Sequence, residues 1–202
     1  MAPFTDPVET EVKFHVTDPA AMRARLTALG ARSLGRSHER NIRFEDEGRN
    51  LIRRNCLLRL RRDRKTTLTF KSPPAEADPA FKQFVELEAE VADFDAMQRI
   101  LAALGYHPEQ TYEKWRETLV LERTTFCLDA LPFGDFLEIE GPKDAILNAG
   151  GRLDRLRHRF RGGGGRRRVG VDHGVRSGSA DSRLRRLRFP RVLERGRRDV
   201  DG

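Results

Sequence analysis

The sequence predicts an α+β fold in which about eight strands close into a barrel, with charged side chains in the lumen and helices outside. Three observations lead to this prediction. Segment after segment alternates charged and apolar residues at period two, which is the pattern of β-strands. The charged faces are rich in arginine and carboxylates, whereas a solvated sheet face would freely accept lysine, threonine, serine and glutamine. Eight strands are enough to close around side chains or one small ligand.

The first strand is predicted over residues 8–16, where Glu9, Glu11 and Lys13 alternate with apolar or β-branched residues. These three side chains share one face, about 6–7 Å apart along the strand. Two carboxylates at that spacing can share a hard divalent cation such as Mg²⁺ or Mn²⁺. Lys13 fits beside them if the other partner of the cation is an anion such as phosphate. Taken alone, this stretch is more typical of a half-exposed strand that has a solvated charged face.

Two helix patterns divide the strands into two halves, which indicates an internal duplication. The first begins at the N-cap Asp18 and ends at Gly30, and the second runs from Asp93 to Gly105. Between the two helices, a strand is expected over residues 39–44, followed by a turn at 45–48.

A hairpin with basic residues on one face is predicted over residues 57–61 and 66–72. Arg59 and Arg61 come from its first strand and Lys71 from its second. A further strand over 85–91 carries Glu86, Glu88 and Glu90 on one face. The second half adds strands over 112–121, 124–131 and 136–140, whose charged residues are Lys114, Arg116, Asp129, Glu138 and Glu140. A helix of undetermined length follows Gly141. In the closed barrel all these charges face the lumen, where the cations suit a polyphosphate and the carboxylates suit its metal.

The cysteine pattern argues against a disulfide framework. Cys56 and Cys127 are far apart, neither has a CxxC partner, and the five histidines are scattered, so a zinc site is not expected. Cys127, close to Asp129, is interpreted as a small buried thiol and not as a nucleophile. No apolar stretch has the length of a signal-peptide core or a membrane span, so a cytoplasmic protein without membrane association is expected.

The positive charge is concentrated after residue 150. Residues 151–202 carry 17 Arg, no Lys and six acidic residues, whereas residues 1–150 carry 22 basic and 25 acidic residues. We therefore expect a tunnel domain over 1–149 and an Arg/Gly-rich tail over 150–202. Three interpretations of the tail stay open: a nucleic-acid-binding arm, a disordered solvated extension, and translation out of frame. The last is favoured because lysine disappears and the helical periodicity stops. Nucleic acid is not expected as a partner.

Several motifs occur together in one order: Glu9-x-Glu11-x-Lys13, Leu58-Arg59-Leu60-Arg61, Thr69-x-Lys71-Ser-Pro, Glu86-x-Glu88-x-Glu90, Lys114-x-Arg116, and Asp129 followed by Glu138-Ile139-Glu140-Gly141. Over about residues 7–148 this series resembles the CYTH superfamily, the triphosphate tunnel metalloenzymes. That superfamily includes class IV adenylyl cyclases, thiamine triphosphatases and inorganic triphosphatases. The resemblance implies an eight-stranded antiparallel tunnel, a divalent metal and a triphosphate-bearing substrate.

By position, the resemblance assigns the metal to Glu9, Glu11, Glu138 and Glu140, assisted by Asp129 and by Glu88 or Glu90. It assigns the triphosphate to Lys13, Arg59, Arg61, Lys71, Lys114 and Arg116, and the catalytic role to Glu9, Glu11 and Lys13. The expected activity is Mg²⁺- or Mn²⁺-dependent hydrolysis of tripolyphosphate, ATP or thiamine triphosphate. The alternatives are a cyclase that converts ATP to cyclic AMP and pyrophosphate, and a non-catalytic polyphosphate- or nucleotide-binding module. The His-Phe pair that some cyclases carry ahead of the first motif is absent, which favours hydrolysis. A homodimer stays open.

Overall fold

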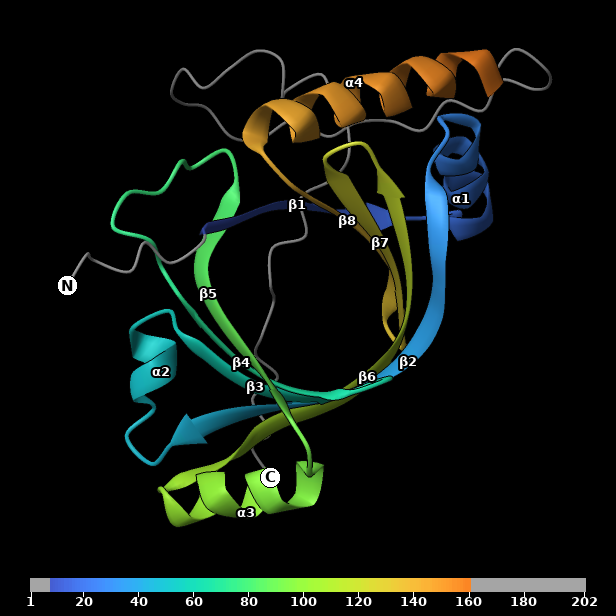
Figure 1. Ribbon diagram of the computed structural model, residues 1–202. Helices are drawn as coiled ribbons and strands as arrows, with labels where there is room; N and C mark the ends of the chain where they lie inside the picture. The colour runs from blue at the N-terminus through green and yellow to red at the C-terminus, as the bar shows by residue number, and fades with distance from the viewer. Residues whose placement is uncertain (1–7, 161–202) are drawn as a thin grey trace, which may run out of the picture.

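The computed structural model describes residues 8–160, and side chains as far as Asp154. In this part of the chain, eight antiparallel strands close into a barrel in the order β1-β5-β4-β3-β2-β6-β7-β8, and β1 completes the ring by pairing with both β5 and β8 (Figure 1). The strands are β1 (Val8–Val16), β2 (Arg32–Asp46), β3 (Leu57–Arg62), β4 (Thr66–Ser72), β5 (Lys82–Val91), β6 (Tyr106–Leu121), β7 (Thr124–Leu131) and β8 (Gly134–Glu140). The predicted fold class is confirmed.

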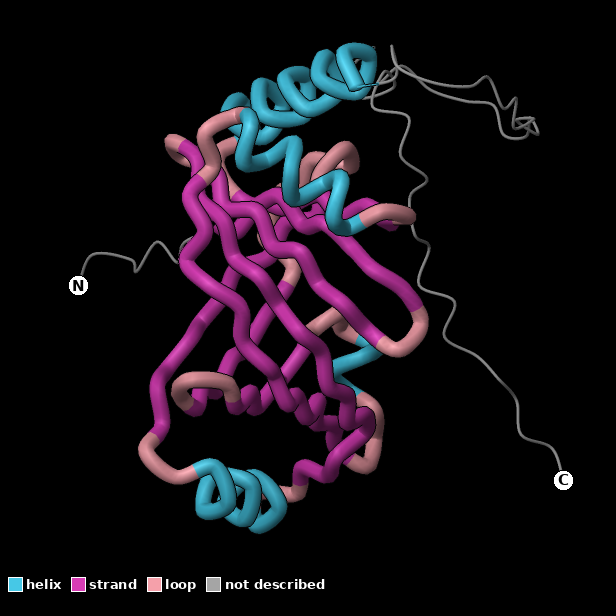
Figure 2. Tube along the Cα trace, turned by 90° about the vertical axis from the view of Figure 1, so that its right-hand side faces the viewer, coloured by secondary structure: helices cyan, strands magenta, loops and turns pink. Residues whose placement is uncertain are grey.

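Four helices flank the barrel within the described residues: α1 (Pro19–Ala28), α2 (Asn50–Arg53), α3 (Phe94–Ala103) and α4 (Lys143–Phe160). Helices α1 and α4 lie together on one side, and α3 lies at the opposite side (Figures 1 and 2). Between residues 8 and 160, no helix combines the length and the apolar character needed to cross a membrane.

The two predicted helix starts are present. Asp18 and Asp93 each accept a hydrogen bond of 2.9 Å from the backbone N–H three residues ahead, which satisfies a donor that the first turn leaves open. Gly30 and Gly105 follow the ends of these helices with φ angles of 93° and 89°, a conformation that glycine adopts without strain.

The apolar core lies outside the barrel, between strands and helices. One cluster joins α1 and α4 to the barrel and another joins α2 and α3 to it. The first includes Phe14, Leu26, Leu119, Phe126, Leu137, Ile139, Ile146, Ala149 and Leu153, and the second includes Ile42, Phe44, Leu51, Leu58, Leu60, Phe94 and Leu101. Since each strand alternates sides, burying these residues outward turns their charged neighbours into the lumen.

Some elements differ from the sequence-based expectation. Strand β2 begins at Arg32 and not at residue 39, and β6 begins at Tyr106 and not at residue 112. The extra part of β2 is largely solvent-exposed, so it lacks the apolar alternation that marked the other strands. Helix α2 was not predicted, because four residues are too few for a periodic pattern. Its first N–H groups are satisfied by the buried Glu45 carboxylate, which accepts from Leu51 at 2.9 Å and Ile52 at 2.8 Å.

Helix α4 continues through the boundary placed after residue 149. Its side chains at Ile146, Ala149 and Leu153 are buried in the core beside α1. Arg152 holds this helix from outside, donating to the backbone oxygen of Leu29 at 3.2 Å and to Glu122 at 2.9 Å. The segment up to Phe160 is thus part of the helical layer on this side of the barrel. Residues 161–202 of the predicted tail lie outside the described part of the chain.

Candidate functional site

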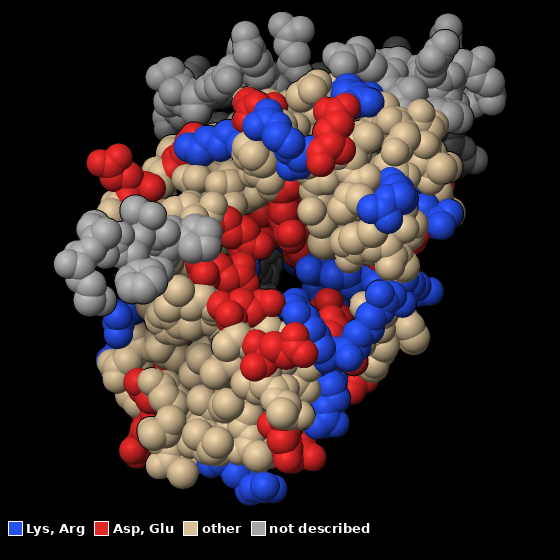
Figure 3. All heavy atoms as spheres, in the orientation of Figure 1, with Lys and Arg blue, Asp and Glu red and all other residues tan. Residues whose placement is uncertain are grey.

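The lumen is polar and divided by charge. In the space-filling view a hollow passes into the molecule, with Asp and Glu gathered along one side of its opening and Lys and Arg along the other (Figure 3). Acidic and basic side chains thus lie on different sides of this opening.

A carboxylate cluster forms where β1 pairs with β8. Carboxylate oxygens of Glu9, Glu11 and Glu140 lie within 4.8 Å of one another, and Glu11 is the direct cross-strand partner of Glu140. Burial raises the pKa of Glu140 to about 7, and the negative charges of Glu9, Glu138 and Glu11 add to this effect against Arg116. Burial also raises the pKa of Glu9. Burial thus disfavours the charged forms of Glu140 and Glu9, and a cation bound beside them would favour those forms.

Lysines approach this cluster from β4 and β5. Lys71 contacts Glu9 directly and lies 3.1 Å from Glu86, while Lys82 lies 3.0 Å from Glu11. Burial opposes the charged form of Lys71, but its bonds to Glu9 and Glu86 raise the pKa of its amine above the usual value. Lys71 is therefore a cation beside the carboxylate cluster. Glu86 was among the charges expected in the lumen but not among the predicted site residues.

A second group of charges on β6, β7 and β8 is already neutralised. Asp129 accepts from Lys114 at 2.7 Å and from Nε and an Nη atom of Arg116 at 2.6 Å each. Arg116 also contacts Glu138, which lies 2.9 Å from Lys13. Burial favours the neutral acid, yet Arg116, Lys114 and Lys13 together hold the pKa of Glu138 well below its usual range. Asp129 and Glu138 are thus bonded to cations, in contrast to Glu140.

The wall formed by β2, β3 and β4 has polar atoms that lack partners. Among the described residues, Arg59 Nε, Arg61 Nε, Thr67 Oγ1 and Asn41 Oδ1 are buried without a hydrogen bond. The outer guanidinium nitrogens of the two arginines make long contacts only, 3.5 Å from Arg59 to Thr69 and 3.5 Å from Arg61 to Glu88. Buried polar atoms are normally hydrogen-bonded, so these atoms are available to a polar ligand, although Arg61 Nε lies 3.9 Å from Asp63 Oδ2.

Two predicted metal ligands lie apart from the carboxylate cluster. Glu88 accepts from Thr69 at 3.1 Å and faces Arg61. Glu90, whose side chain is 64% exposed, lies 3.3 Å from Lys65 at the far end of β5. Neither belongs to the groups of described residues whose ligand atoms converge. The structure therefore places these two glutamates with the arginine wall and not with the cluster.

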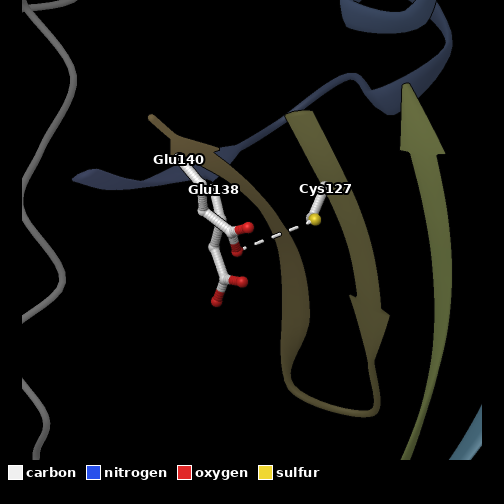
Figure 4. Close-up of side chains that lie close together, drawn as sticks. All are labelled: Cys127, Glu138 and Glu140. Atoms are coloured by element: carbon white, nitrogen blue, oxygen red, sulfur yellow. Dashed lines mark hydrogen bonds between the residues drawn. The ribbon is translucent and has the colours of Figure 1, made fainter. Parts of the chain in front are cut away.

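Cys127 lies on β7, beside the two carboxylates of β8. Its sulfur is 3.9 Å from Glu140 Oε1, and its ligand atom converges with those of Glu138 and Glu140 (Figure 4). Burial raises the pKa of the thiol to about 12, so the neutral thiol prevails near pH 7. The predicted burial of this thiol is confirmed.

Sequence reasoning overlooked Glu39 and Asn41. Glu39 is buried 3.4 Å from Lys114 and 3.7 Å from Arg116, and Asn41 follows two residues later on the same face. The signal was present, because Glu39, Asn41 and Arg43 alternate with Arg40, Ile42 and Phe44. Their strand was recognised, but its polar face was not assigned to the lumen.

The comparison with known proteins agrees with this architecture. Residues 8–146 match the CYTH domain. The chain belongs to the CYTH domain family. A protein of Methanocaldococcus jannaschii, provisionally named an adenylate cyclase, is 27% identical over 148 residues, covering 69% of this chain and 83% of the relative.

Solved structures share the CYTH fold. One from Pyrococcus horikoshii is 29% identical, with a TM-score of 0.62 and coverage of 72% of this chain and 89% of the other. Two provisionally named adenylate cyclases support the fold alone. The Vibrio parahaemolyticus structure is 21% identical with a TM-score of 0.63 and coverage of 78% and 90%; the Hippeastrum structure is 20% identical with a TM-score of 0.55 and coverage of 75% and 85%.

Proposed function

We propose that this CYTH protein binds a triphosphate in its lumen together with Mg²⁺ or Mn²⁺ and hydrolyses it. The observation that carries the proposal is that the arginine wall and the carboxylate cluster lie on opposite sides of the barrel. One wall presents buried arginine nitrogens without hydrogen-bond partners, and the other presents the Glu9, Glu11 and Glu140 carboxylates with oxygens within 4.8 Å. A metal triphosphate can bind to both, since its oxygens accept from arginine and its cation binds carboxylates.

The arginine wall positions the anion. Arg59 and Arg61 project from adjacent lumen positions of β3, and Thr67 and Thr69 of β4 lie opposite them in the register. A fixed row of donors aligns a chain of phosphates without the reorganisation that water would require. Lys71 extends this row toward the carboxylate cluster through its contacts with Glu9 and Glu86.

The carboxylate cluster suits the metal. Glutamate oxygens are the hard ligands that Mg²⁺ and Mn²⁺ prefer, and the partly buried Glu140 has its pKa raised to about 7 by desolvation and by neighbouring carboxylates. A bound cation would neutralise phosphate charge and polarise the phosphoryl oxygens. Glu138 and Asp129 are proposed to hold Lys13 and Arg116 in place, and the 37%-exposed side chain of Lys13 leaves its amine accessible to phosphate.

Cyclisation of ATP is the second candidate, because the Methanocaldococcus jannaschii relative is provisionally named an adenylate cyclase. We place hydrolysis first because the sequence lacks the His-Phe pair ahead of Glu9. The Hippeastrum protein, named in the same provisional way, is described as having a dominant triphosphatase activity. The fold is therefore compatible with either reaction.

The test is a parallel incubation of the full chain with tripolyphosphate and with ATP, each with Mg²⁺ or Mn²⁺, followed by product analysis. Release of orthophosphate supports hydrolysis, whereas cyclic AMP with pyrophosphate selects the cyclase. Binding without turnover would select a non-catalytic module. The Glu9→Gln, Glu11→Gln double variant is the control, because it removes cluster charge with little change in volume, and it should form no product.

A further inference from the structure

One end of the lumen is aromatic. His15 and Phe136 are cross-strand partners on β1 and β8, two positions beyond Lys13 and two positions before Glu138 respectively. By the alternation of strands they share the lumen side with those charged residues. Phe136 is only 4% exposed, yet it belongs to neither of the core clusters found among the described residues. It is therefore an apolar group placed at the end of a charged tunnel.

The three rings form a connected group. The Phe136 ring lies 5.6 Å from the His15 ring at 84° and 5.9 Å from the Phe133 ring at 61°, which are edge-to-face arrangements. Phe133 belongs to the turn between β7 and β8 and is 73% exposed. The turn lies close to β1: a Cβ atom added to Gly134 would lie only 3.1 Å from His15 Nε2. The group thus extends from the buried Phe136 to an open ring face at Phe133.

Lys13 links this group to the proposed phosphate site. Its amine lies 5.0 Å from the centre of the Phe136 ring and 2.9 Å from Glu138 Oε1. A ligand whose phosphate contacts Lys13 would therefore place its next chemical group at the rings. An inorganic polyphosphate has no ring that could stack on an aromatic side chain, whereas a planar heterocycle stacks on one.

We propose that His15, Phe133 and Phe136 form a ring-binding subsite, so that the substrate is an organic triphosphate with a planar aromatic heterocycle. This inference rests on the proposed function, because it needs the phosphates to occupy the lumen. Phe133 provides the accessible stacking face. Phe136 packs against Phe133, and His15 packs against Phe136. A nucleobase and the rings of thiamine share the required chemistry.

The test measures binding of ATP, thiamine triphosphate and tripolyphosphate, each with Mg²⁺, to the full chain and to Phe133→Ala. Phe133 is largely exposed, so its replacement should leave the fold unchanged. We expect the variant to bind the preferred organic triphosphate at least about fivefold more weakly, while tripolyphosphate binding stays unchanged. Phe133→Trp should retain binding of the organic ligand. Leu104→Ala is the matched control, because Leu104 is an exposed apolar residue, 68% accessible, directly after α3.

The outcomes are distinguishable. Tighter binding of ATP than of thiamine triphosphate by the wild type would identify a nucleobase ligand, and the reverse order a thiamine ligand. Equal loss of tripolyphosphate and organic ligands in Phe133→Ala, or no loss of either, would overturn the subsite while leaving the proposed function standing. Failure of all three ligands to bind the wild type would overturn the proposed function and the subsite with it.

Discussion

Lys114 Nζ lies 2.7 Å from Asp129 Oδ2, and the two side chains are only 6% and 0% exposed. The bidentate contact from Arg116 to the same carboxylate completes a buried network. Lys114, which the sequence assigned to triphosphate binding, is therefore paired within the protein. Its first role in this structure is to neutralise Asp129 between β6 and β7.

Removing the Asp129 charge should destabilise the protein. Asp129→Asn removes the nearest anion that Lys114 and Arg116 share and leaves them the longer contacts to Glu39, at 3.4 and 3.7 Å, and the contact of Arg116 with Glu138. Breaking a buried pair in this way costs about 3–5 kcal/mol. Urea unfolding measures the difference. Glu113→Gln is the control, since Glu113 lies next to Lys114 on β6 but is 56% exposed and contacts only His38 among the ion pairs of the described residues. If Asp129→Asn proved as stable as this control, the network would not contribute as described.

The carboxylates expected to bind metal should separate into two groups. Glu9→Gln or Glu11→Gln should weaken Mn²⁺ binding and abolish metal-dependent turnover, because each removes an oxygen ligand from the cluster. Glu90→Gln should change neither property, since Glu90 lies near Lys65 and away from the cluster. Mn²⁺ titration and activity assays provide the comparison. A similar loss in all three variants would contradict the assignment of the metal to Glu9 and Glu11 and not to Glu90.

The arginine wall should contribute to triphosphate binding by its inward side only. Arg59→Ala or Arg61→Ala should weaken binding of tripolyphosphate by about 1.5–3 kcal/mol, the range for hydrogen bonds to charged groups. Arg62 is the matched control on the same strand, because it points outward, 4.1 Å from the Phe94 ring and 3.4 Å from Asp95. Calorimetric titration of the three variants tests this, and an equal loss in Arg62→Ala would contradict the assignment of faces.

Helix α4 should stabilise the barrel beyond residue 149. Leu153 is 3% exposed in the core, so Leu153→Ala should lower the free energy of unfolding by about 2–5 kcal/mol. For the same reason a chain that ends at Asn148 should melt at a lower temperature than one that ends at Phe160. Thermal unfolding of both truncated chains measures this difference. Identical melting temperatures would mean that this part of the helix does not stabilise the barrel.

Acid should weaken the cap of α3. The backbone N–H of Ala96 lowers the pKa of Asp93 below the usual 3.8. A depressed folded-state pKa stabilises the fold above the unfolded value, and this stability is lost as the pH falls through the folded value. Asp93→Asn keeps a capping oxygen but does not titrate. Its melting temperature should therefore fall less than that of the wild type between about pH 5 and about pH 3; parallel curves would refute this cap contribution.

The periodic pattern was sufficient for the barrel and for the sidedness of its strands. Glu9, Glu11 and Lys13 needed only their spacing to be placed on one face. The pairing of charges could not be obtained in this way, because it depends on the strand order. Lys71 contacts Glu9 only because β4 and β1 both flank β5, and Glu140 meets Glu11 only because β8 closes the ring.

Contacts between distant residues also explain why helix α2 and the end of helix α4 were not predicted. The apolar positions Ile146, Ala149 and Leu153 repeat at helical spacing, but the arginines that begin at Arg152 led the segment to be assigned to the tail. Helix α2 depends on the Glu45 carboxylate, which reaches its N–H groups from the preceding strand. Composition and local periodicity do not report a contact of that kind.

The central claim is that the carboxylate cluster and the arginine wall bind one metal-triphosphate ligand. Its most direct test is Mn²⁺ binding followed by electron paramagnetic resonance, with and without tripolyphosphate. We predict that the wild type binds Mn²⁺ more tightly when tripolyphosphate is present. The double variant with Arg59→Ala and Arg61→Ala should lose this enhancement. The double variant with Glu9→Gln and Glu11→Gln should lose Mn²⁺ binding. Equal Mn²⁺ affinity in the wild type and the double glutamate variant, unaffected by tripolyphosphate, would contradict the claim.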